Sequence, residues 1–354
     1  MKIIDKHIGR QVVKGAVMTL VVLVAIDLVF AYAREVNDIG RGDYDFAKSL
    51  IYTFLTAPRR AYDFMPMAAI VGSMVMLGSL ARNSEFIAMR SAGISVARIS
   101  GSVIKSGLIL VIIALVLGEV VTPFSEPYAQ QMRSFATTKS TALRSEHGIW
   151  VRDGSNFINI QQARLDGELR ELDIYEFDDS LKLRNIAHAT SAQYEDSSWT
   201  LYDLEQIRLS KEELKLEKVA KARWDALFNP DVISVLAVKP EQLPIWRLTT
   251  YMDYLRVNGL TTEPYEFAFW RKITTPLAIL IMLLLSVPFL FTSIRTSGAG
   301  QRIMIGIVLG IGYYLVTHLT GRLGEVYDFD PMLSSVIPSL IFLLLGIIGI
   351  RFTT

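Results

Sequence analysis

The residue types that most often carry catalysis or bind metals occur here without the spacing that such chemistry requires. The sequence has no cysteine, which excludes disulfides, a thiol nucleophile and thiolate metal sites. Its four histidines, His7, His147, His188 and His318, show no metal-ligand spacing and form no H-E-x-x-H motif. The G-x-S-x-G and G-x-x-x-x-G-K-[ST] motifs are also missing. We therefore expect a non-enzymatic chain with no catalytic residue, metal site or cofactor, and no ATP bound by the chain itself.

Charged residues inside apolar segments are the next candidates for chemistry. Asp27 interrupts the first long apolar run, and a carboxylate there costs about 2.5–3.5 kcal/mol on insertion scales. Glu119, His318 and Arg322 lie near the ends of other apolar runs. Such residues either line a cavity or gate, or pair with polar groups on neighbouring helices. Pairing is the interpretation that we favour for Asp27 and His318.

The stretch ARNSEFIAMRSAGIS, residues 81–95, predicts one short helix between two apolar runs. Asn83 or Ser84 is suited to the N-cap, Glu85 suits the positive end of the helix, and Gly93 is a typical stop. A rigid helix of about two turns could pass a rigid-body displacement between partners. The alternative is an amphipathic segment on lipid headgroups. That alternative would call for several Lys and Arg residues, whereas this stretch has only Arg90 within the expected helix.

The elements that must position these residues are membrane helices. The chain is 51% hydrophobic with a mean hydropathy of +0.35. A membrane-spanning helix needs about 20 mostly apolar residues. The segments that qualify are residues 15–33, 64–81, 103–121, 274–292, 303–320 and 332–350. The net charge is +1 without a basic run, so nucleic acid is not an expected partner.

Basic residues beside the apolar segments predict the orientation. Six spans put one group of bases on the same side, so both termini and residues 81–95 are expected in the cytoplasm. These bases are Lys2, Lys6, Arg10, Lys14, Arg82, Arg90, Arg98, Arg295, Arg302 and Arg351. We expect the first helix to be retained, because Asp5 and Asp27 are atypical of a signal peptide. The opposite side also carries bases, including Arg34, Arg41 and Arg133. They form either a surface of mixed charge or a site for an anionic ligand.

Residues 148–228 alternate between apolar and polar side chains, which predicts strands with one buried face. Asp153-Gly154 predicts a hairpin turn, and the lack of long helices between the strands favours a β-sandwich or jelly roll. Residues 245–259 predict a short helix that ends at a glycine. Residues 96–121 predict a third membrane helix of 26 residues that overruns the bilayer core. Gly72, Gly306 and Gly310 belong to small-residue packing faces.

Three stretches carry a family resemblance that extends over essentially the whole chain. They are FMPMAAIVGSMVMLGSLARNSEFIAMRSAGIS, GIWVRDGSNFINI and YEFAFWRKITTPLAILIMLLLSVPFLF. In this order the chain resembles the lipopolysaccharide-export permease family, which has two branches, LptF and LptG. The stretch GIWVRDGSNF is closer to the LptG branch.

The resemblance implies a fold and a function. The fold is an α-helical membrane protein with six transmembrane helices plus a periplasmic β-jellyroll. Its divisions are residues 1–122 with a coupling helix at 84–92, then 123–264, then 265–354. The implied function is a permease subunit of an ABC transporter in the bacterial inner membrane. This transporter extracts lipopolysaccharide from the outer leaflet and passes it toward the outer membrane. Implied partners are an LptB ATPase dimer that binds ATP, LptF, LptC, lipopolysaccharide and, indirectly, LptA.

The resemblance also assigns residues. The ATPase-coupling residues are Ser84, Glu85, Phe86, Met89 and Arg90, with Glu85 as the charged contact. The lipopolysaccharide-binding residues that the resemblance implies are Arg34, Arg41 and Arg133, and arginine suits phosphate geometry.

The competing interpretations are the sister subunit LptF, another ABC-type lipid or lipoprotein permease, a secondary transporter and a membrane enzyme. The number of spans argues against other ABC permeases, and the lack of an internal repeat argues against a secondary transporter.

Overall fold

The computed structural model describes residues 3–138, 142–164, 168–178, 180, 182–195, 198–209, 214–224, 239–291, 299–327 and 329–351. The chain forms two compact units. The first comprises Met1–Asn37, Thr53–Glu126 and Glu263–Thr354, and the second comprises Asp38–Tyr52 and Pro127–Thr262.

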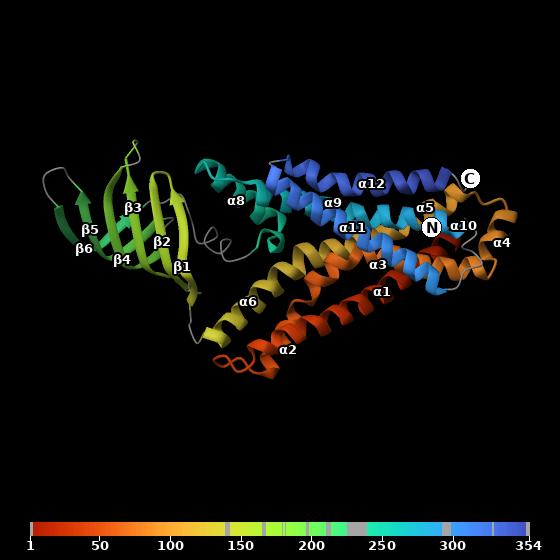
Figure 1. Ribbon diagram of the computed structural model, residues 1–354, viewed down its shortest axis with the longest axis horizontal. Coiled ribbons are helices and arrows are strands. Elements are labelled where there is room, and N and C mark those ends of the chain that lie inside the picture. Colours follow the sequence, from red (N-terminus) through yellow and green to blue (C-terminus); the bar gives the residue numbers. More distant parts are fainter. Residues whose placement is uncertain are drawn as a thin grey trace. The chain divides into compact units, whose positions relative to one another are not determined.

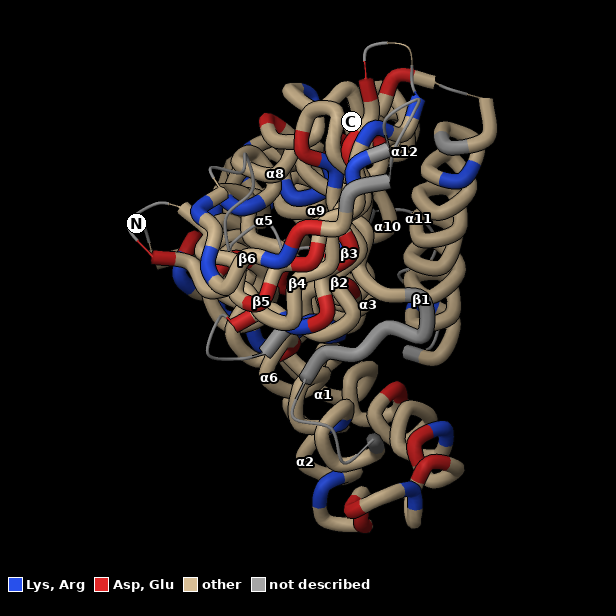
Figure 2. The backbone as a smooth tube through the Cα atoms, turned by 90° about the vertical axis from the view of Figure 1, so that its left-hand side faces the viewer, with Lys and Arg blue, Asp and Glu red and all other residues tan. Residues whose placement is uncertain are grey.

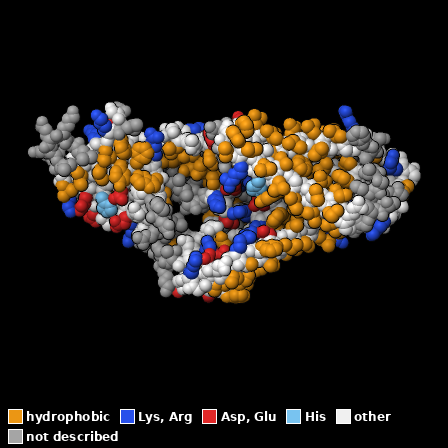
Figure 3. Space-filling model, in the orientation of Figure 1, with side chains coloured by type: hydrophobic (Ala, Val, Ile, Leu, Met, Phe, Trp, Pro, Cys, Tyr) orange, Lys and Arg blue, Asp and Glu red, His pale blue; other side chains and the backbone are white. Residues whose placement is uncertain are grey.

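The helical unit is built from long apolar helices that run beside one another (Figure 1). Its elements are α1 (Ile3–Glu35), α3 (Ala57–Arg82), α4 (Glu85–Ser91), α5 (Val96–Leu115), the π-helical segment η2 (Val116–Val121), α9 (Glu263–Ser286), α10 (Pro288–Phe291), α11 (Ala299–Tyr327) and α12 (Pro331–Arg351). Within the described residues, six helices are long and apolar enough to cross a membrane, which confirms the predicted number of spans. Figure 3 shows hydrophobic side chains over most of the visible helical surface, and α11 is uncharged over most of its length in Figure 2.

The core of the helical unit forms where an apolar stripe of α1 packs on α3, α5 and α9. Ile8, Val12, Ala16 and Leu20 follow one another at intervals of four residues on α1, and they belong to one buried cluster with residues of those helices. Helices α1 and α3 approach closely at Gly15 and Gly72, where a Cβ on Gly72 would lie 2.3 Å from the Gly15 backbone. The glycines therefore have a packing role, as predicted. Gly306 and Gly310 of α11 similarly pack on Val71 and Met67 of α3.

The third membrane helix is longer and less regular than predicted. It continues from α5 through η2 into α6 (Thr122–Thr138), so helix occupies the positions after 121 where the prediction starts the β domain. The helix continues past its predicted end at residue 121, and Pro127 lies inside α6. The first strand begins at Ala142.

The second unit contains one antiparallel sheet whose described strands are neighbours in chain order. The strands are β1 (Ala142–Asp153), β2 (Asn156–Arg164), β3 (Leu169–Phe177), β4 (Leu183–Glu195), β5 (Ser198–Leu209) and β6 (Leu214–Trp224). Asp153 pairs with Asn156, which confirms the predicted hairpin. A separate antiparallel β domain is present as predicted, and its described strands pair in chain order.

The alternation of the strands gives the sheet a buried face. Ile158, Ile160, Leu172, Ala189 and Trp199 are essentially inaccessible to solvent. The unit also contains η3 (Pro240–Gln242) and α8 (Ile245–Val257), and α8 confirms the predicted short helix. Residues 36–55 add η1 (Val36–Asp38) and α2 (Phe46–Leu55).

Candidate functional site

The short helix α4 lies between two membrane helices, as the sequence predicts, but its N-terminus differs from the expectation. Asn83 follows the last turn of α3, and Ser84 has a left-handed backbone (φ 60°) without a side-chain capping bond. The predicted side-chain cap at Asn83 or Ser84 is therefore wrong, and a sharp backbone turn begins the helix instead. The C-terminus agrees with the prediction. Gly93 has φ 81°, its N–H donates to the Arg90 carbonyl, and the Ile94 N–H donates to the Met89 carbonyl.

Glu85 contacts the first helix of its own chain. Its Oε2 lies 2.9 Å from His7 Nε2, and both side chains are partly exposed. Nearby, the buried Asp5 accepts hydrogen bonds from Ser102 Oγ (2.5 Å) and Arg98 Nη2 (3.2 Å) on α5. The start of α1 is thus tied to both α4 and α5, and sequence reasoning missed these ties because the partners are about 80 to 100 residues apart.

The predicted coupling residues divide into buried and exposed ones. Phe86 is only 3% exposed and packs in the core of the helical unit, and Met89 is partly buried against the same core. Phe86 is therefore an internal anchor in this structure, which corrects the expectation that it offers an apolar contact surface. Ser84 and Arg90 are exposed. Ile87, which the sequence analysis did not choose, is 43% exposed and provides the outward apolar surface.

The structure brings two of the three predicted anion-binding arginines to one carboxylate. Asp38 Oδ1 accepts a hydrogen bond from Arg41 Nη1 (2.6 Å), and Asp38 Oδ2 accepts one from Arg133 Nη2 (2.5 Å). The Arg133 guanidinium also lies 5.4 Å from the centre of the Tyr52 ring. Arg34 is exposed on the last turn of α1 and belongs to the helical unit. Figure 2 shows acidic (red) and basic (blue) positions interspersed in the chain beside α2.

A groove lies next to this cluster within the second unit. Tyr128, Met132 and Phe135 recur at intervals of four and three residues on α6, so they share one helical face. Asp43 and Lys48 also line the groove. The groove thus combines one acidic and one basic side chain with the apolar face of α6.

Two ion pairs account for Asp27 and Glu119, two of the charged residues that the sequence places in apolar segments. Asp27 pairs with Arg60 of α3, which confirms the interhelical pairing favoured for Asp27. Glu119 Oε1 lies 2.7 Å from Lys272 Nζ, which also donates to the Gly118 carbonyl at 3.1 Å. Lys272 comes from α9, so it holds the π-helical segment against that helix. His318 stacks against Tyr314 with ring centroids 4.2 Å apart.

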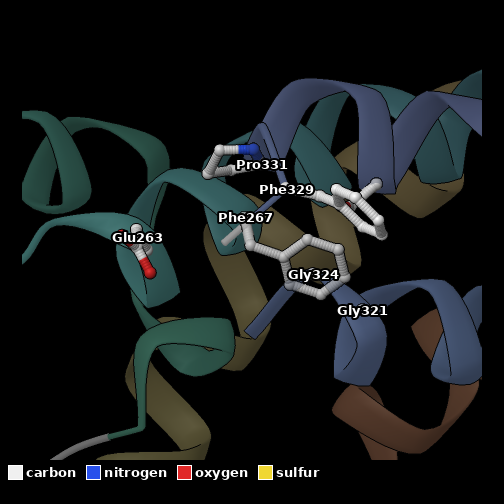
Figure 4. Close-up of a pocket in the computed structure, with 7 residues that line it drawn as sticks. Glu263, Phe267, Gly321, Gly324, Phe329 and Pro331 are labelled. Carbon is white, nitrogen blue, oxygen red and sulfur yellow. The ribbon is translucent and has the colours of Figure 1, made fainter. Parts of the chain in front are cut away.

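A small pocket at the ends of α9, α11 and α12 is the product of close helix packing. Figure 4 shows the Phe267 ring beside Gly321 and Gly324 of α11, with Phe329 next to it. A Cβ on Gly321 would lie 2.6 Å from that ring. The glycines therefore make room for the aromatic side chain.

These features define a multi-pass membrane protein whose described residues form six apolar helices long enough to cross a membrane, with a separate antiparallel β domain between the third and the fourth in the sequence. The chain belongs to the family of the lipopolysaccharide export system permeases LptF/LptG, whose sequence model matches residues 6–351. It is 32% identical over 344 residues to the lipopolysaccharide export system permease protein LptG of Haemophilus influenzae, covering 97% of this chain and 96% of that protein. It is 30% identical over 348 residues to the protein of the same name from Escherichia coli, covering 98% and 97%.

Proposed function

We propose that this chain is the LptG-type permease subunit of an ABC transporter that extracts lipopolysaccharide from the outer leaflet of the inner membrane and passes it toward the outer membrane. The observation that carries this proposal is the match to LptG proteins over nearly the whole of both chains. The six apolar helices and the separate β domain support it, since a lipid must leave a membrane and then cross an aqueous space.

The proposed orientation places both termini and α4 in the cytoplasm and the β domain in the periplasm. It rests on the basic residues beside the spans. The proposed partners are an LptB ATPase dimer, LptF and LptC, with LptA receiving the lipid. In this arrangement ATP binds to the ATPase, and the present chain is a non-catalytic subunit.

The proposed coupling element is α4, residues 84–92. Phe86 anchors it in the helical core, and Glu85 joins it to α1 through His7. Because α4 contacts α1 and α3, and α1 is tied to α5 through Asp5, a displacement of α4 would move these helices together. The exposed side chains Ile87 and Arg90 would face the ATPase.

The proposed lipid contacts are Arg34, Arg41 and Arg133. Charge-assisted hydrogen bonds to phosphate are stronger than neutral ones, and the planar guanidinium group can form two of them in parallel. The groove beside Arg133 supports the same role, because it adds the apolar surface of α6.

Co-purification and reconstitution test the proposal. The tagged chain should co-purify with an ATPase dimer and a sister permease. The complex in liposomes should release lipopolysaccharide to purified LptA only when ATP is hydrolysed. A chain that purifies alone, or a complex that releases lipid equally with a non-hydrolysable ATP analogue, would contradict the proposed function.

A further inference from the structure

Asp38 has an unusual position for a residue beside a proposed anion site. Its side chain is only 18% exposed, and each of its two oxygens accepts a hydrogen bond from a different guanidinium group. Arg41 comes from the same loop, whereas Arg133 comes from α6. The carboxylate therefore bridges the two arginines in the way that a phosphate with several terminal oxygens would.

Other contacts hold the two arginines near each other without Asp38. The Asp43 N–H donates to the Ala136 carbonyl at 2.7 Å, which fastens the loop to α6. Gly42 has φ 58°, and a Cβ at this position would lie 2.5 Å from the Ala136 oxygen. The Tyr52 ring contacts Arg133, and the Tyr52 hydroxyl accepts a hydrogen bond from Gln130 at 3.2 Å. Removal of the Asp38 charge should thus leave both guanidinium groups facing the same point.

We propose that Asp38 is an internal counter-ion that competes with a phosphate of the transported lipid for Arg41 and Arg133. This inference rests on the proposed function. Arg41 is mostly exposed and Arg133 is about one-third exposed, so each pair is weak enough for a doubly charged phosphate to displace. Asp38 then re-forms its pairs when the phosphate leaves, which makes retention weaker and release easier.

The test compares neutral variants of Asp38 in the assembled transporter. Binding of fluorescent lipopolysaccharide to the complex in nanodiscs should be about two- to fivefold tighter for Asp38→Asn than for the unchanged chain. The gain should shrink when the probe is lipopolysaccharide from which one lipid A phosphate has been removed. Asp38→Ser serves as a second neutral variant in case the amide disturbs assembly.

Asp45→Asn is the matched control. It removes one negative charge from the same loop, and Asp45 caps the start of α2 by accepting from the Lys48 N–H at 2.8 Å. Asparagine is an equally good cap, so binding should be unchanged.

The outcomes separate this inference from the proposed function. If Arg41→Ala and Arg133→Ala weaken binding while both neutral Asp38 variants leave it unchanged or weaker, Asp38 orients the arginines and the inference is overturned. If neither arginine variant changes binding and removal of a phosphate has no effect, the lipid role of this cluster fails and the inference fails with it.

Discussion

Glu85 is the proposed charged contact with the ATPase. Its carboxylate already has a partner within the chain, His7. A loss of coupling after substitution of Glu85 could therefore arise from a lost contact with the ATPase or from a loosened α1.

Two variants separate these explanations. Glu85→Lys should abolish ATP-driven lipopolysaccharide release or weaken assembly with the ATPase, because it reverses the charge on an exposed helix. His7→Gln removes the internal ion pair and leaves Glu85 in place, so it should retain at least half of the release rate. Equal loss in both variants, measured as release per ATP hydrolysed, would assign the role of Glu85 to the internal pair.

Phe86 and Ile87 are adjacent residues with opposite environments, and they allow a matched comparison. Phe86→Ala should lower the free energy of unfolding by about 3–5 kcal/mol, because it leaves a cavity in the core. Ile87→Ala should change stability little and instead weaken binding of the purified ATPase, since Ile87 is outward-facing. Thermal unfolding in detergent and ATPase titration measure the two effects. Strong destabilisation by Ile87→Ala alone would contradict this assignment of faces.

At the scale of elements, the π-helical segment η2 depends on a residue that is distant in sequence. Lys272 is 5% exposed and Glu119 19%, so the pair lies largely away from solvent. Lys272→Met should reduce stability by about 3–5 kcal/mol, because Glu119 would lose its counter-charge. The double variant Lys272→Met with Glu119→Gln should recover most of that loss. Thermal unfolding of the single and double variants tests this coupling, and additive losses would contradict it.

Hydrogen bonds join the helix α8 to the β1–β2 turn. The Tyr254 hydroxyl donates to the Arg152 carbonyl at 2.6 Å, and the Gly154 N–H donates to Asn258 Oδ1 at 2.9 Å. Burial raises the pKa of Tyr254 from 10.0 to about 12. The folded state therefore retains the phenol proton more strongly than the unfolded state does.

Because the pKa of Tyr254 is higher in the folded state than in the unfolded state, the stability of the protein depends on pH. The contribution of Tyr254 to stability is complete below pH 10 and is lost as the pH rises toward about 12. Tyr254→Phe should cost about 1 kcal/mol at neutral pH through the lost hydrogen bond, and it should make stability less dependent on pH in the alkaline range. Unfolding of the full chain, followed by the fluorescence of its tryptophans between pH 8 and 12, measures both effects. An unchanged alkaline slope in Tyr254→Phe would show that other groups cause it.

Local sequence patterns predicted the helices and strands better than the irregular segments between them. Apolar length predicted the six spans, Asp153-Gly154 predicted the hairpin, and Gly93 predicted the end of α4, because each depends on neighbouring residues. The continuation of the helix through Pro127 was not predictable in the same way. The preceding segment η2 is held by Lys272, which donates to the Gly118 carbonyl from 154 residues further along the chain. A local sequence pattern does not contain such a contact. Asp27 indicated that it needed a partner, but the sequence could not identify Arg60. Nothing in the sequence distinguished Asp38 from the other acidic residues of its loop.

At the scale of the whole molecule, the predicted lipid-binding arginines are divided between the two compact units. Arg34 belongs to the helical unit, and Arg41 and Arg133 belong to the unit that contains the sheet. The chain passes between the units at residues 37–38, 52–53, 126–127 and 262–263. Each group of arginines therefore needs its own test, because a defect in one unit need not report on the other.

Photocrosslinking of lipopolysaccharide to the assembled transporter provides that test. Arg34→Glu and Arg133→Glu should each reduce crosslinking at least about fivefold, because a repulsive charge replaces a charge-assisted hydrogen bond to phosphate. Arg133→Glu also places a second carboxylate beside Asp38, so the neutral Arg133→Gln should accompany it and give a smaller loss in the same direction. Arg256→Glu makes the same charge change on α8, where Arg256 pairs with the exposed Asp253, and it should leave crosslinking unchanged. If Arg34→Glu and Arg133→Glu both crosslink as well as Arg256→Glu does, neither arginine binds the lipid, and the surplus bases on this side form only a surface of mixed charge.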